Sequence, residues 1–524
     1  MGECFDRRSF VKGGLAAGLS IAAASGIVAC APSSQKQDAG SGSDKDSTGK
    51  ASYNPSETKT CDVVVVGSGP AGLSAAIEAC ELGLSTVLLE SQSVAGGNLN
   101  GTEGLMGIGS PQTIVQGVDV DPMDLLNHEL DLFRYQVDAV LWKDMALASG
   151  ENIKWLMDHG VSFEDKAVDY TNNPDNPQIY HRWKAGTTPA DPMVSSFSDL
   201  GGELMLETSG KDLILGDGGA VVGVYAEKKD GTIVQIDAKS VILAGGGYVN
   251  NTEMIADIIG HEDYYTRSTD GHDGSTIAMA VAVGARDMTP HQTLMGYPTC
   301  RHLDAKMGWY SLVPLMNNPC YIWVNQDGER FTNEANSLVT PGLQLVSKLT
   351  QKTSYVVIDS EMLKKDFRAD VDFVSVLEDG IASGCSNLWK ADTIEELAQK
   401  SGLDKNTLLE TVDTYNGYCE AGYDEDFRKP VEQLVSFSHP PYYMWEHGVY
   451  VTTTIGGLDY NRAMEVLDAR REAIPGLYVA GVDGSKIYKN FYTIDVSGSC
   501  NANNIHTGRT AAKSAAGYIG KKGN

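Results

Sequence analysis

The sequence predicts an α/β protein built on a doubly wound, Rossmann-like parallel sheet. Three observations support this prediction: a short apolar run ends in a glycine-rich turn, a helical segment follows the turn, and a second apolar run ends on an acidic residue. At 524 residues the chain also exceeds one ordinary hydrophobic core, so we expect two or three folded units.

The first expected element is a strand over residues 61–66, because its valine-rich run suits the interior of a parallel sheet. The motif GSGPAG follows directly. Gly67 permits a tight turn, Gly69 allows the backbone to approach a pyrophosphate, and Gly72 allows the next helix to pack against the strand. Since a helix N-terminus attracts anions, the motif predicts a phosphate site at this turn.

The next two elements complete a dinucleotide-binding unit. An amphipathic helix is expected through Leu82, followed by a second strand over residues 85–89. Glu90 comes next, eighteen residues past Gly72, where an acidic side chain binds a ribose hydroxyl. This ordered combination is much more specific than a GxGxxG motif by itself.

Further glycine-containing segments occur later in the chain. They are Gly96-Gly97-Asn98, a strand with terminal glycines over residues 240–247, the run 476–481, and the segment 498–509 before an alanine-rich helix. In this order they resemble the flavoprotein family of fumarate reductase and succinate dehydrogenase, whose branches include ketosteroid dehydrogenases and exported alkene reductases. The resemblance extends over most of the chain after residue 59.

The resemblance implies a Rossmann-like FAD-binding domain that is split by an α+β capping domain. The expected divisions are a signal over 1–30, a flexible linker over 31–58, the FAD-binding domain over 59–290 and 447–524, and the cap over 291–446. No histidine precedes Gly96 at the position where covalent members of the family attach the cofactor. We therefore expect noncovalent FAD.

The resemblance also assigns residues to FAD. The strand region near Gly210 looks like the segment whose backbone meets the adenine, Asp273 looks like part of the family's GDG turn, and Asp483 is expected to reach the ribityl chain. The full set of expected cofactor-binding residues is Gly67, Gly69, Ala71, Gly72, Glu90, Ser91, Gly96, Gly97, Asn98, Gly210, Ala244, Gly245, Gly246, Asp273, Gly481, Asp483, Ser499 and Cys500.

The expected substrate site departs from that of fumarate reductases. Residues 325–334 match the family's NxxGxRFxNE stretch, and this register places Leu338 where those enzymes have their proton-donating arginine. Thr453 and Asp495 fall where the family binds carboxylates with a histidine and an arginine, and Tyr297 replaces the histidine of its HPT stretch. Without these cations the site lacks the means to hold a dicarboxylate. We therefore predict a substrate other than fumarate or succinate.

Aromatic residues gather in the same regions and suit a larger, flatter ligand, although each is equally well explained as a core residue. Tyr492 and Tyr297 are the candidate proton donors, because a phenol can protonate a developing enolate. Asp495 would favour a substrate hydroxyl or amine, or else cap a helix or lie in a loop. The aromatic residues in question are Tyr297, Trp309, Tyr310, Tyr321, Trp323, Tyr450, Tyr488, Phe491 and Tyr492.

Three functions are compatible with these residues. The first is a reductase that saturates the activated C=C bond of an aromatic, enone or steroid-like substrate, with hydride from flavin N5 and a proton from a side chain. The second is a ketosteroid-type dehydrogenase that runs the same chemistry in reverse. The third is a flavin electron-carrier subunit without a substrate of its own. An aromatic cavity beside the flavin favours the two enzymes over the carrier.

The N-terminus predicts export. Arg7-Arg8 precede an apolar stretch over residues 14–29, which together form a twin-arginine signal. The stretch ends in a lipobox-like sequence, so Cys30 is expected to carry a lipid, and simple cleavage nearby is the alternative. The protein would then act on the outer face of the cytoplasmic membrane or in the periplasm, with the lipid as its only membrane attachment.

Charge and motif content limit the partners. A formal net charge of −28 and a pI near 4.7 argue against nucleic acid. The cysteines are scattered singly, so we expect no metal. Neither a second dinucleotide unit nor a haem motif is found, which predicts a separate cytochrome or quinol-oxidising electron donor. Arg330 and Glu334 are interpreted as an internal ion pair.

Overall fold

The computed structural model describes residues 53–170, 176–259, 264–266, 268–291, 293–300, 318–337, 350–365, 372–489, 492 and 496–520. Residues 53–520 belong to one compact unit. No helix within the described ranges combines the length and the apolar character of a membrane span.

The larger sheet of the described chain has eight strands and confirms the predicted α/β class. β15 (Ala473–Val479), β8 (Ile233–Leu243), β1 (Glu57–Val66), β2 (Thr86–Leu89) and β5 (Glu203–Met205) lie next to one another in that order and run parallel. The expected first strand begins earlier than predicted, because residues 57–60 already pair with β8. The last residues of the predicted linker therefore belong to the sheet.

Antiparallel strands extend this sheet from β8 and β15. β7 (Val221–Lys228) pairs with β8 and with β6 (Thr208–Leu215), whereas β14 (Glu465–Leu467) pairs with β15. A separate two-stranded antiparallel sheet consists of β3 (Gly104–Met106) and β4 (Tyr180–Arg182). The carboxyl ends of the parallel strands meet at one edge, where such sheets bind their ligands.

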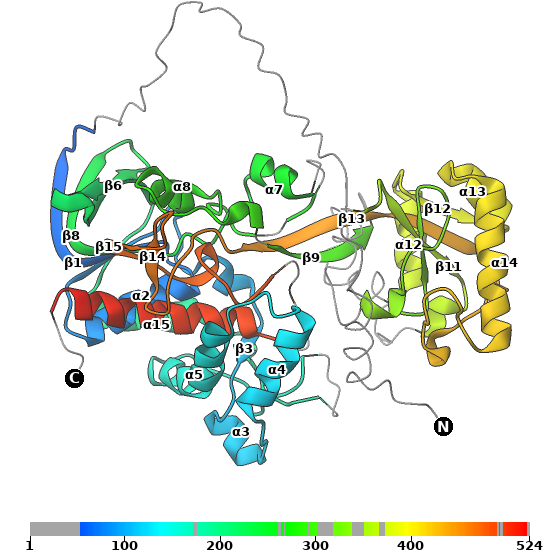
Figure 1. Ribbon diagram of the computed structural model, residues 1–524, viewed down its shortest axis with the longest axis horizontal. Helices are drawn as coiled ribbons and strands as arrows, with labels where there is room; N and C mark the ends of the chain where they lie inside the picture. Colours follow the sequence, from blue (N-terminus) through cyan, green and yellow to red (C-terminus); the bar gives the residue numbers. More distant parts are fainter. Residues whose placement is uncertain are drawn as a thin grey trace, which may run out of the picture. The chain divides into compact units, whose positions relative to one another are not determined.

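Helices cover the larger sheet and complete its core. α2 (Pro70–Glu81) and α15 (Ser499–Tyr518) lie side by side, as Figure 1 shows, and Gly508 lets them approach because its hydrogen faces the Ala71 carbonyl of α2. The other helices associated with this sheet are α3 (Pro111–Gln116), α4 (Pro122–Leu132), α5 (Ala139–Asp158), α6 (Ala190–Asp199), α7 (Thr252–Ile259) and α8 (Ser275–Ala282).

A second hydrophobic core surrounds a five-stranded sheet. Its strands are β9 (Thr293–Cys300), β10 (Ile322–Asn325), β11 (Ser354–Asp359), β12 (Leu388–Ala391) and β13 (Tyr442–Ile455), and its helices are α12 (Phe373–Ala382), α13 (Ile394–Ser401) and α14 (Lys405–Ala421). The interval that forms this sheet interrupts the larger sheet in the sequence. The exact bounds 59–290, 291–446 and 447–524 stay a prediction.

β13 connects the two hydrophobic cores. Its first part pairs with β11 and β12, and its second part pairs with β9 (Figure 1). Near its end, the Thr454 hydroxyl accepts a hydrogen bond from the Tyr248 N–H at 2.8 Å, close to the end of β8. One strand thus runs across the predicted division at residues 446 and 447.

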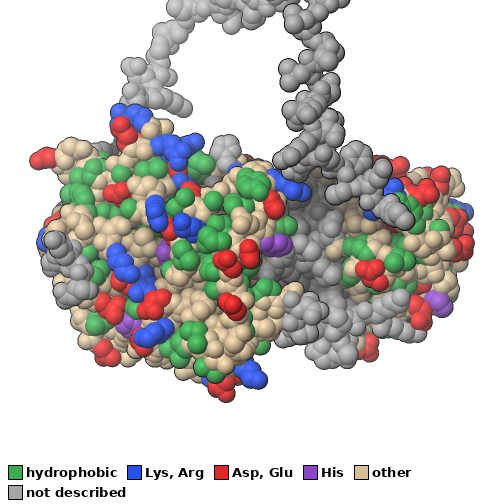
Figure 2. All heavy atoms as spheres, turned by 60° about the horizontal axis from the view of Figure 1, so that its bottom comes forward, with side chains coloured by type: hydrophobic (Ala, Val, Ile, Leu, Met, Phe, Trp, Pro, Cys, Tyr) green, Lys and Arg blue, Asp and Glu red, His purple; other side chains and the backbone are tan. Residues whose placement is uncertain are grey.

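The described surface is polar and mixed in charge. On the face shown in Figure 2, Lys and Arg side chains are interspersed with Asp and Glu. Such mixing is typical of a solvated protein surface. The cysteines of the described ranges form no disulfide with one another.

Candidate active site

A deep cavity lies at the carboxyl ends of the parallel strands. Its volume is about 1190 Å³, larger than the roughly 300–1,000 Å³ of sites for drug-sized ligands. It extends past the ends of β1, β2, β8 and β15 to the first turn of α15 and to β13. The space therefore suits a dinucleotide together with a small substrate.

The first glycine turn forms one wall of the cavity. Gly67 has φ +102°, and a Cβ atom there would lie 2.3 Å from the Ala244 carbonyl oxygen. A Cβ atom on Gly72 would lie 1.8 Å from the Gly67 oxygen, so this glycine packs the helix onto the turn. Gly69 lines the cavity and has no atom within 4 Å of an added Cβ, which leaves its backbone accessible to a ligand.

The acidic residue predicted after the second strand lies on the cavity wall. Glu90 is buried, and one of its carboxylate oxygens accepts hydrogen bonds from the Ser68 hydroxyl at 2.5 Å and the Ser68 N–H at 3.2 Å. The other oxygen accepts the Gln92 N–H at 2.8 Å. These bonds hold the carboxylate beside the phosphate turn, where a ribose would follow the pyrophosphate.

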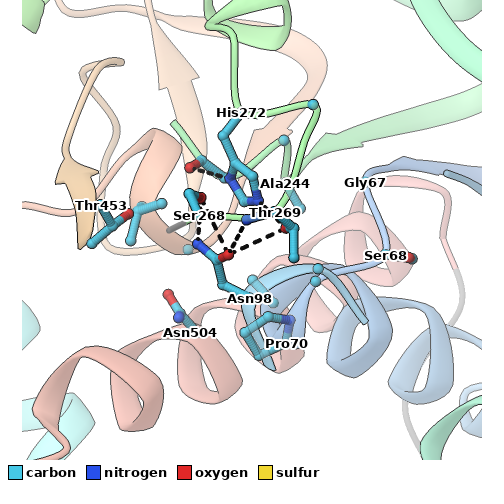
Figure 3. Close-up of a pocket in the computed structure, with 18 of the residues that line it drawn as sticks. Gly67, Ser68, Pro70, Asn98, Ala244, Ser268, Thr269, His272, Thr453 and Asn504 are labelled. Atoms are coloured by element: carbon cyan, nitrogen blue, oxygen red, sulfur yellow. Dashed lines mark hydrogen bonds between the residues drawn. The ribbon is translucent and has the colours of Figure 1, made fainter. Parts of the chain in front are cut away.

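The loop over residues 268–273 lines the cavity and contacts Asn98 and Gly246. The Asn98 side-chain oxygen accepts the Thr269 N–H at 2.9 Å, and its amide nitrogen donates to Ser268 at 2.9 Å. The His272 ring is held between the Gly246 carbonyl, 2.8 Å from Nδ1, and the Thr269 hydroxyl, 3.0 Å from Nε2 (Figure 3). The neighbouring Asp273 was the only sequence signal for this segment.

Asp483 supports the glycine loop after β8 from behind the cavity wall. Its carboxylate accepts the N–H groups of Gly245 and Gly247, each at 2.7 Å, and the Thr276 hydroxyl at 2.9 Å. Burial raises the pKa of this carboxyl above its usual value, and the three hydrogen bonds partly offset that effect. The structure thus gives Asp483 a positioning role for residues of the wall.

Most of the predicted cofactor residues meet at this one cavity. Four of them, Gly72, Gly96, Asp483 and Ser499, lie behind the lining, and whether each residue of the set contacts the cofactor stays a prediction. The predicted residues that line the cavity are Gly67, Gly69, Ala71, Glu90, Ser91, Gly97, Asn98, Gly210, Ala244, Gly245, Gly246, Asp273, Gly481 and Cys500.

Four tyrosines line the cavity, and three of them, Tyr170, Tyr180 and Tyr492, lie near one another at what we call its tyrosine end. Tyr492 and Tyr450 are among the four, as the sequence suggested, but Tyr170 and Tyr180 were not expected. Burial raises the pKa of the Tyr492 phenol well above its usual value, so the hydroxyl keeps its proton. Because its pKa is raised, this phenol is a weak acid, and it can give its proton only to a strongly basic atom.

Several other candidate aromatics belong to the hydrophobic cores. Tyr321 and Trp323 are buried in the smaller core, and Tyr488 is buried in the larger one, so of the two interpretations that the sequence left open these three residues fit the core. Tyr297 lies in β9 opposite Tyr450, and its side chain is outside the description. Trp309, Tyr310, Leu338, Phe491 and Asp495 lie outside the described residues.

Positive charge is scarce on the described wall of the cavity. Among the lining residues that the structure describes, Lys211 is the only Lys or Arg, and it forms an ion pair with Glu227 at 2.9 Å. Thr453 lines the cavity at the position where fumarate reductases were expected to have a histidine. In the described ranges, no group of three His, Cys, Asp or Glu side chains is arranged to hold a metal.

The interpretation of Arg330 as an internal ion-pair residue is confirmed. Its guanidinium lies 3.0 Å from Glu334 and 3.1 Å from Asp424, and the Lys429 amine lies 3.2 Å from Glu334. These side chains are almost fully buried. A buried, mutually paired set of this kind holds the smaller core together and does not face the cavity.

The residues of the cavity fit FAD. The first turn of α2 offers unpaired N–H groups for a pyrophosphate, and Glu90 stands where the adenosine ribose would lie. Beside the first turn of α2, near Gly481, the buried side-chain oxygen of Asn504 has no hydrogen-bond partner among the described residues. An oxygen of this kind suits a hydrogen-bond donor on the bound cofactor.

Fold and cavity together define a flavoprotein oxidoreductase, and comparison with known proteins identifies the family. A family model described as an FAD binding domain matches residues 62–494. The chain therefore belongs to this family, binds FAD, and is an FAD-dependent oxidoreductase acting on CH–CH or C=C bonds.

Two relatives and one solved structure indicate the branch. The chain is 30% identical to the vinyl phenol reductase of Lactiplantibacillus plantarum, over 87% of this chain and 96% of the relative. It is 29% identical to the urocanate reductase of Eggerthella lenta, over 88% and 75% of the two chains. The open conformation of a flavocytochrome c3 fumarate reductase superposes with a TM-score of 0.64 at 25% identity, over 88% and 79% of the chains.

Proposed function

We propose that this protein reduces the activated C=C bond of a substrate that is not a dicarboxylate, of an aromatic, enone or steroid-like type. The composition of the cavity wall carries the proposal. Four tyrosines line the cavity, and the described lining has no arginine with which to bind carboxylates. The names of two relatives give vinyl phenol and urocanate as what they reduce.

The residues divide the chemistry between cofactor and side chains. When bound, FAD supplies a hydride to one alkene carbon. The glycine turn and the loop over residues 268–273 hold the cofactor, and the tyrosines exclude water and position the flat substrate. Tyr492 or Tyr297 donates the proton that the second alkene carbon requires. Asp495 acts on a substrate hydroxyl or amine.

A viologen-linked assay tests this proposal. The purified, FAD-loaded protein is supplied with reduced viologen under anaerobic conditions and offered fumarate, urocanate, cinnamates, vinyl phenols and enone steroids. We expect turnover with at least one aromatic or enone substrate and little with fumarate. Turnover of fumarate alone would contradict the proposal, and activity only with saturated ketones and an oxidised acceptor would identify a dehydrogenase.

We further propose that the protein is exported through the twin-arginine route, carries a lipid on Cys30, holds FAD noncovalently, and receives electrons from a separate cytochrome or quinol-oxidising protein in anaerobic respiration. The paired arginines and the cysteine after the apolar stretch support export and lipidation. Mass spectrometry of the mature N-terminus tests both, because a lipidated Cys30 and a simple cleavage product differ in mass. Acid precipitation tests the flavin linkage, since noncovalent FAD stays in solution.

A further inference from the structure

Glu103 introduces a negative charge at the tyrosine end of the cavity. It lies immediately before β3, where its carbonyl accepts the Trp183 N–H at 3.0 Å. The neighbouring Gly104 carbonyl accepts the side-chain amide of Asn501 in α15 at 2.9 Å. Glu103 lines the cavity and is only half-buried. Its backbone is thus fixed between the two-stranded β3–β4 sheet and α15.

The Glu103 carboxylate has no counterion in the described part of the chain. No hydrogen bond or ion pair joins it to a described side chain, and its charge adds to the burial that raises the pKa of Tyr180. The nearby Arg182 is occupied elsewhere: its guanidinium lies 5.7 Å from the Tyr170 ring and 5.8 Å from the Tyr180 ring, and donates to the Tyr170 carbonyl. Arg182 does not line the cavity.

We propose that Glu103 determines substrate specificity by binding the hydroxyl of a neutral hydroxyaryl alkene and excluding alkenes that carry a carboxylate. This inference deepens the proposed function and rests on it. A carboxylate in a partly dry cavity gains most from a donor such as a phenol, because the hydrogen bond is charge-assisted. The same charge repels a carboxylate, and the described cation near this end, Arg182, packs on the two tyrosine rings and does not line the cavity.

The tyrosines give the expected ring a place beside Glu103. Tyr170 and Tyr180 pack edge to face with ring centroids 5.2 Å apart, and Tyr492 lies at the same end of the cavity. Aromatic faces and edges of this kind hold a flat ring without adding charge. The site therefore combines an aromatic enclosure with one acceptor, which matches a hydroxystyrene better than a hydroxycinnamate.

Binding of saturated product analogues tests this inference without turnover. The FAD-loaded protein is titrated with 4-ethylphenol, with 3-(4-hydroxyphenyl)propionate, and with the methyl ester of that acid, by calorimetry. We expect the ethylphenol and the neutral ester to bind at least about 10-fold more tightly than the free acid, because only the acid brings a like charge to Glu103. Equal affinity for acid and ester, or no binding of any of the three, would overturn the inference.

Glu103→Gln removes the charge and keeps the shape of the side chain. We expect its preference for ester over acid to shrink to within about 3-fold, as the repulsion is lost. Glu253→Gln, on the exposed part of α7, changes the net charge equally without touching the cavity and should keep the wild-type preference. An unchanged preference in Glu103→Gln would overturn the inference. Failure of the proposed function would appear separately, as absence of turnover with every aromatic alkene.

Discussion

Tyr492 is the residue best placed to supply a proton. It lines the cavity, keeps its phenolic proton because of burial, and packs against Tyr488 with ring centroids 4.9 Å apart. Tyr488 is buried behind it, and its hydroxyl lies 2.8 Å from the Ser499 hydroxyl. The two tyrosines are neighbours, but only one faces the space for a ligand.

Tyr492→Phe should therefore lower kcat by about 10²–10⁴-fold while leaving FAD content unchanged, because proton transfer is lost and the ring is kept. Steady-state kinetics with the best aromatic substrate measure the change. Tyr488→Phe is the matched control and should retain most of the activity. An equal loss in both variants would show that the phenols act only through packing, and activity retained in Tyr492→Phe would transfer the role to Tyr297.

Two glycines of the first turn have different roles: Gly67 is needed for the backbone conformation, and Gly69 is needed for space beside the cofactor. Gly67→Ala should lower the free energy of unfolding of the flavin-free protein by at least about 1–3 kcal/mol, because φ is +102° and the Cβ would meet a backbone oxygen at 2.3 Å. Gly69→Ala should fold with nearly normal stability but lose FAD, since its Cβ would enter the cavity. Denaturant unfolding and flavin titration separate the two effects, and the reverse pattern would contradict the assignment.

Sequence patterns located the residues whose position depends on a local motif. Gly67, Gly69 and Glu90 follow from spacing within one βαβ unit, and they line the cavity. Glu103, Tyr170 and His272 carry no such spacing, because they reach the cavity from segments far apart in the chain. Their place in the cavity wall depends on the tertiary fold, which brings those segments together.

At the scale of elements, the two-stranded β3–β4 sheet contributes Gly104 and Tyr180 to the tyrosine end of the cavity. His181 in β4 is buried, its Nε2 lies 2.6 Å from the Ser110 hydroxyl, and its Nδ1 lies 3.0 Å from the Ile179 carbonyl. Burial lowers the pKa of His181 from 6.5 to about 4. The two-stranded sheet therefore holds a neutral imidazole that resists protonation.

Acid should destabilise the protein through this residue. Between pH 6.5 and pH 4 the unfolded imidazole binds a proton and the folded one does not, so stability is present above this window and falls as the pH decreases. The expected loss is roughly 2 kcal/mol between pH 7 and pH 5. Denaturant unfolding at both pH values measures it. His181→Gln should have a smaller pH dependence, and an identical slope would contradict the assignment.

The contact between α15 and α2 sets the position of the cavity floor. Gly508→Ala would place a Cβ 2.2 Å from the Ala71 carbonyl, so α15 should move away from α2 and FAD binding should weaken. Gly517→Ala, in the same helix, meets no atom within 4 Å and should stabilise the protein by about 0.5–1 kcal/mol. Thermal unfolding and flavin titration compare the two variants. Equal behaviour would show that this close approach is unimportant.

The helices and strands were easier to predict than the pairing between strands. The strand, turn and helix of residues 61–81 follow from composition and glycine spacing, since these are local properties. The sequence of β13 does not indicate which strands it pairs with. In the structure its first part pairs with β11 and β12, and its second part pairs with β9. Pairing between distant segments depends on tertiary packing, which periodicity does not encode.

At the scale of the whole molecule, residues from both sheets line the same cavity. The carboxyl ends of the larger sheet and the first turn of α15 form most of the described wall, and β13 reaches it from the smaller sheet through Tyr450 and Thr453. Aromatic side chains with little positive charge distinguish this wall from one that binds a dicarboxylate. We therefore expect this wall, which residues of both sheets form, to determine which alkene the protein accepts.

Stopped-flow reoxidation of the reduced holoenzyme tests that claim most directly. The bound flavin is photoreduced without oxygen, mixed with either 4-vinylphenol or fumarate, and followed by its absorbance in a single turnover. We predict that the vinyl phenol reoxidises the flavin at least about 100-fold faster than fumarate, which corresponds to roughly 2.7 kcal/mol in the barrier. Reoxidation by fumarate at the same rate or faster would contradict the account.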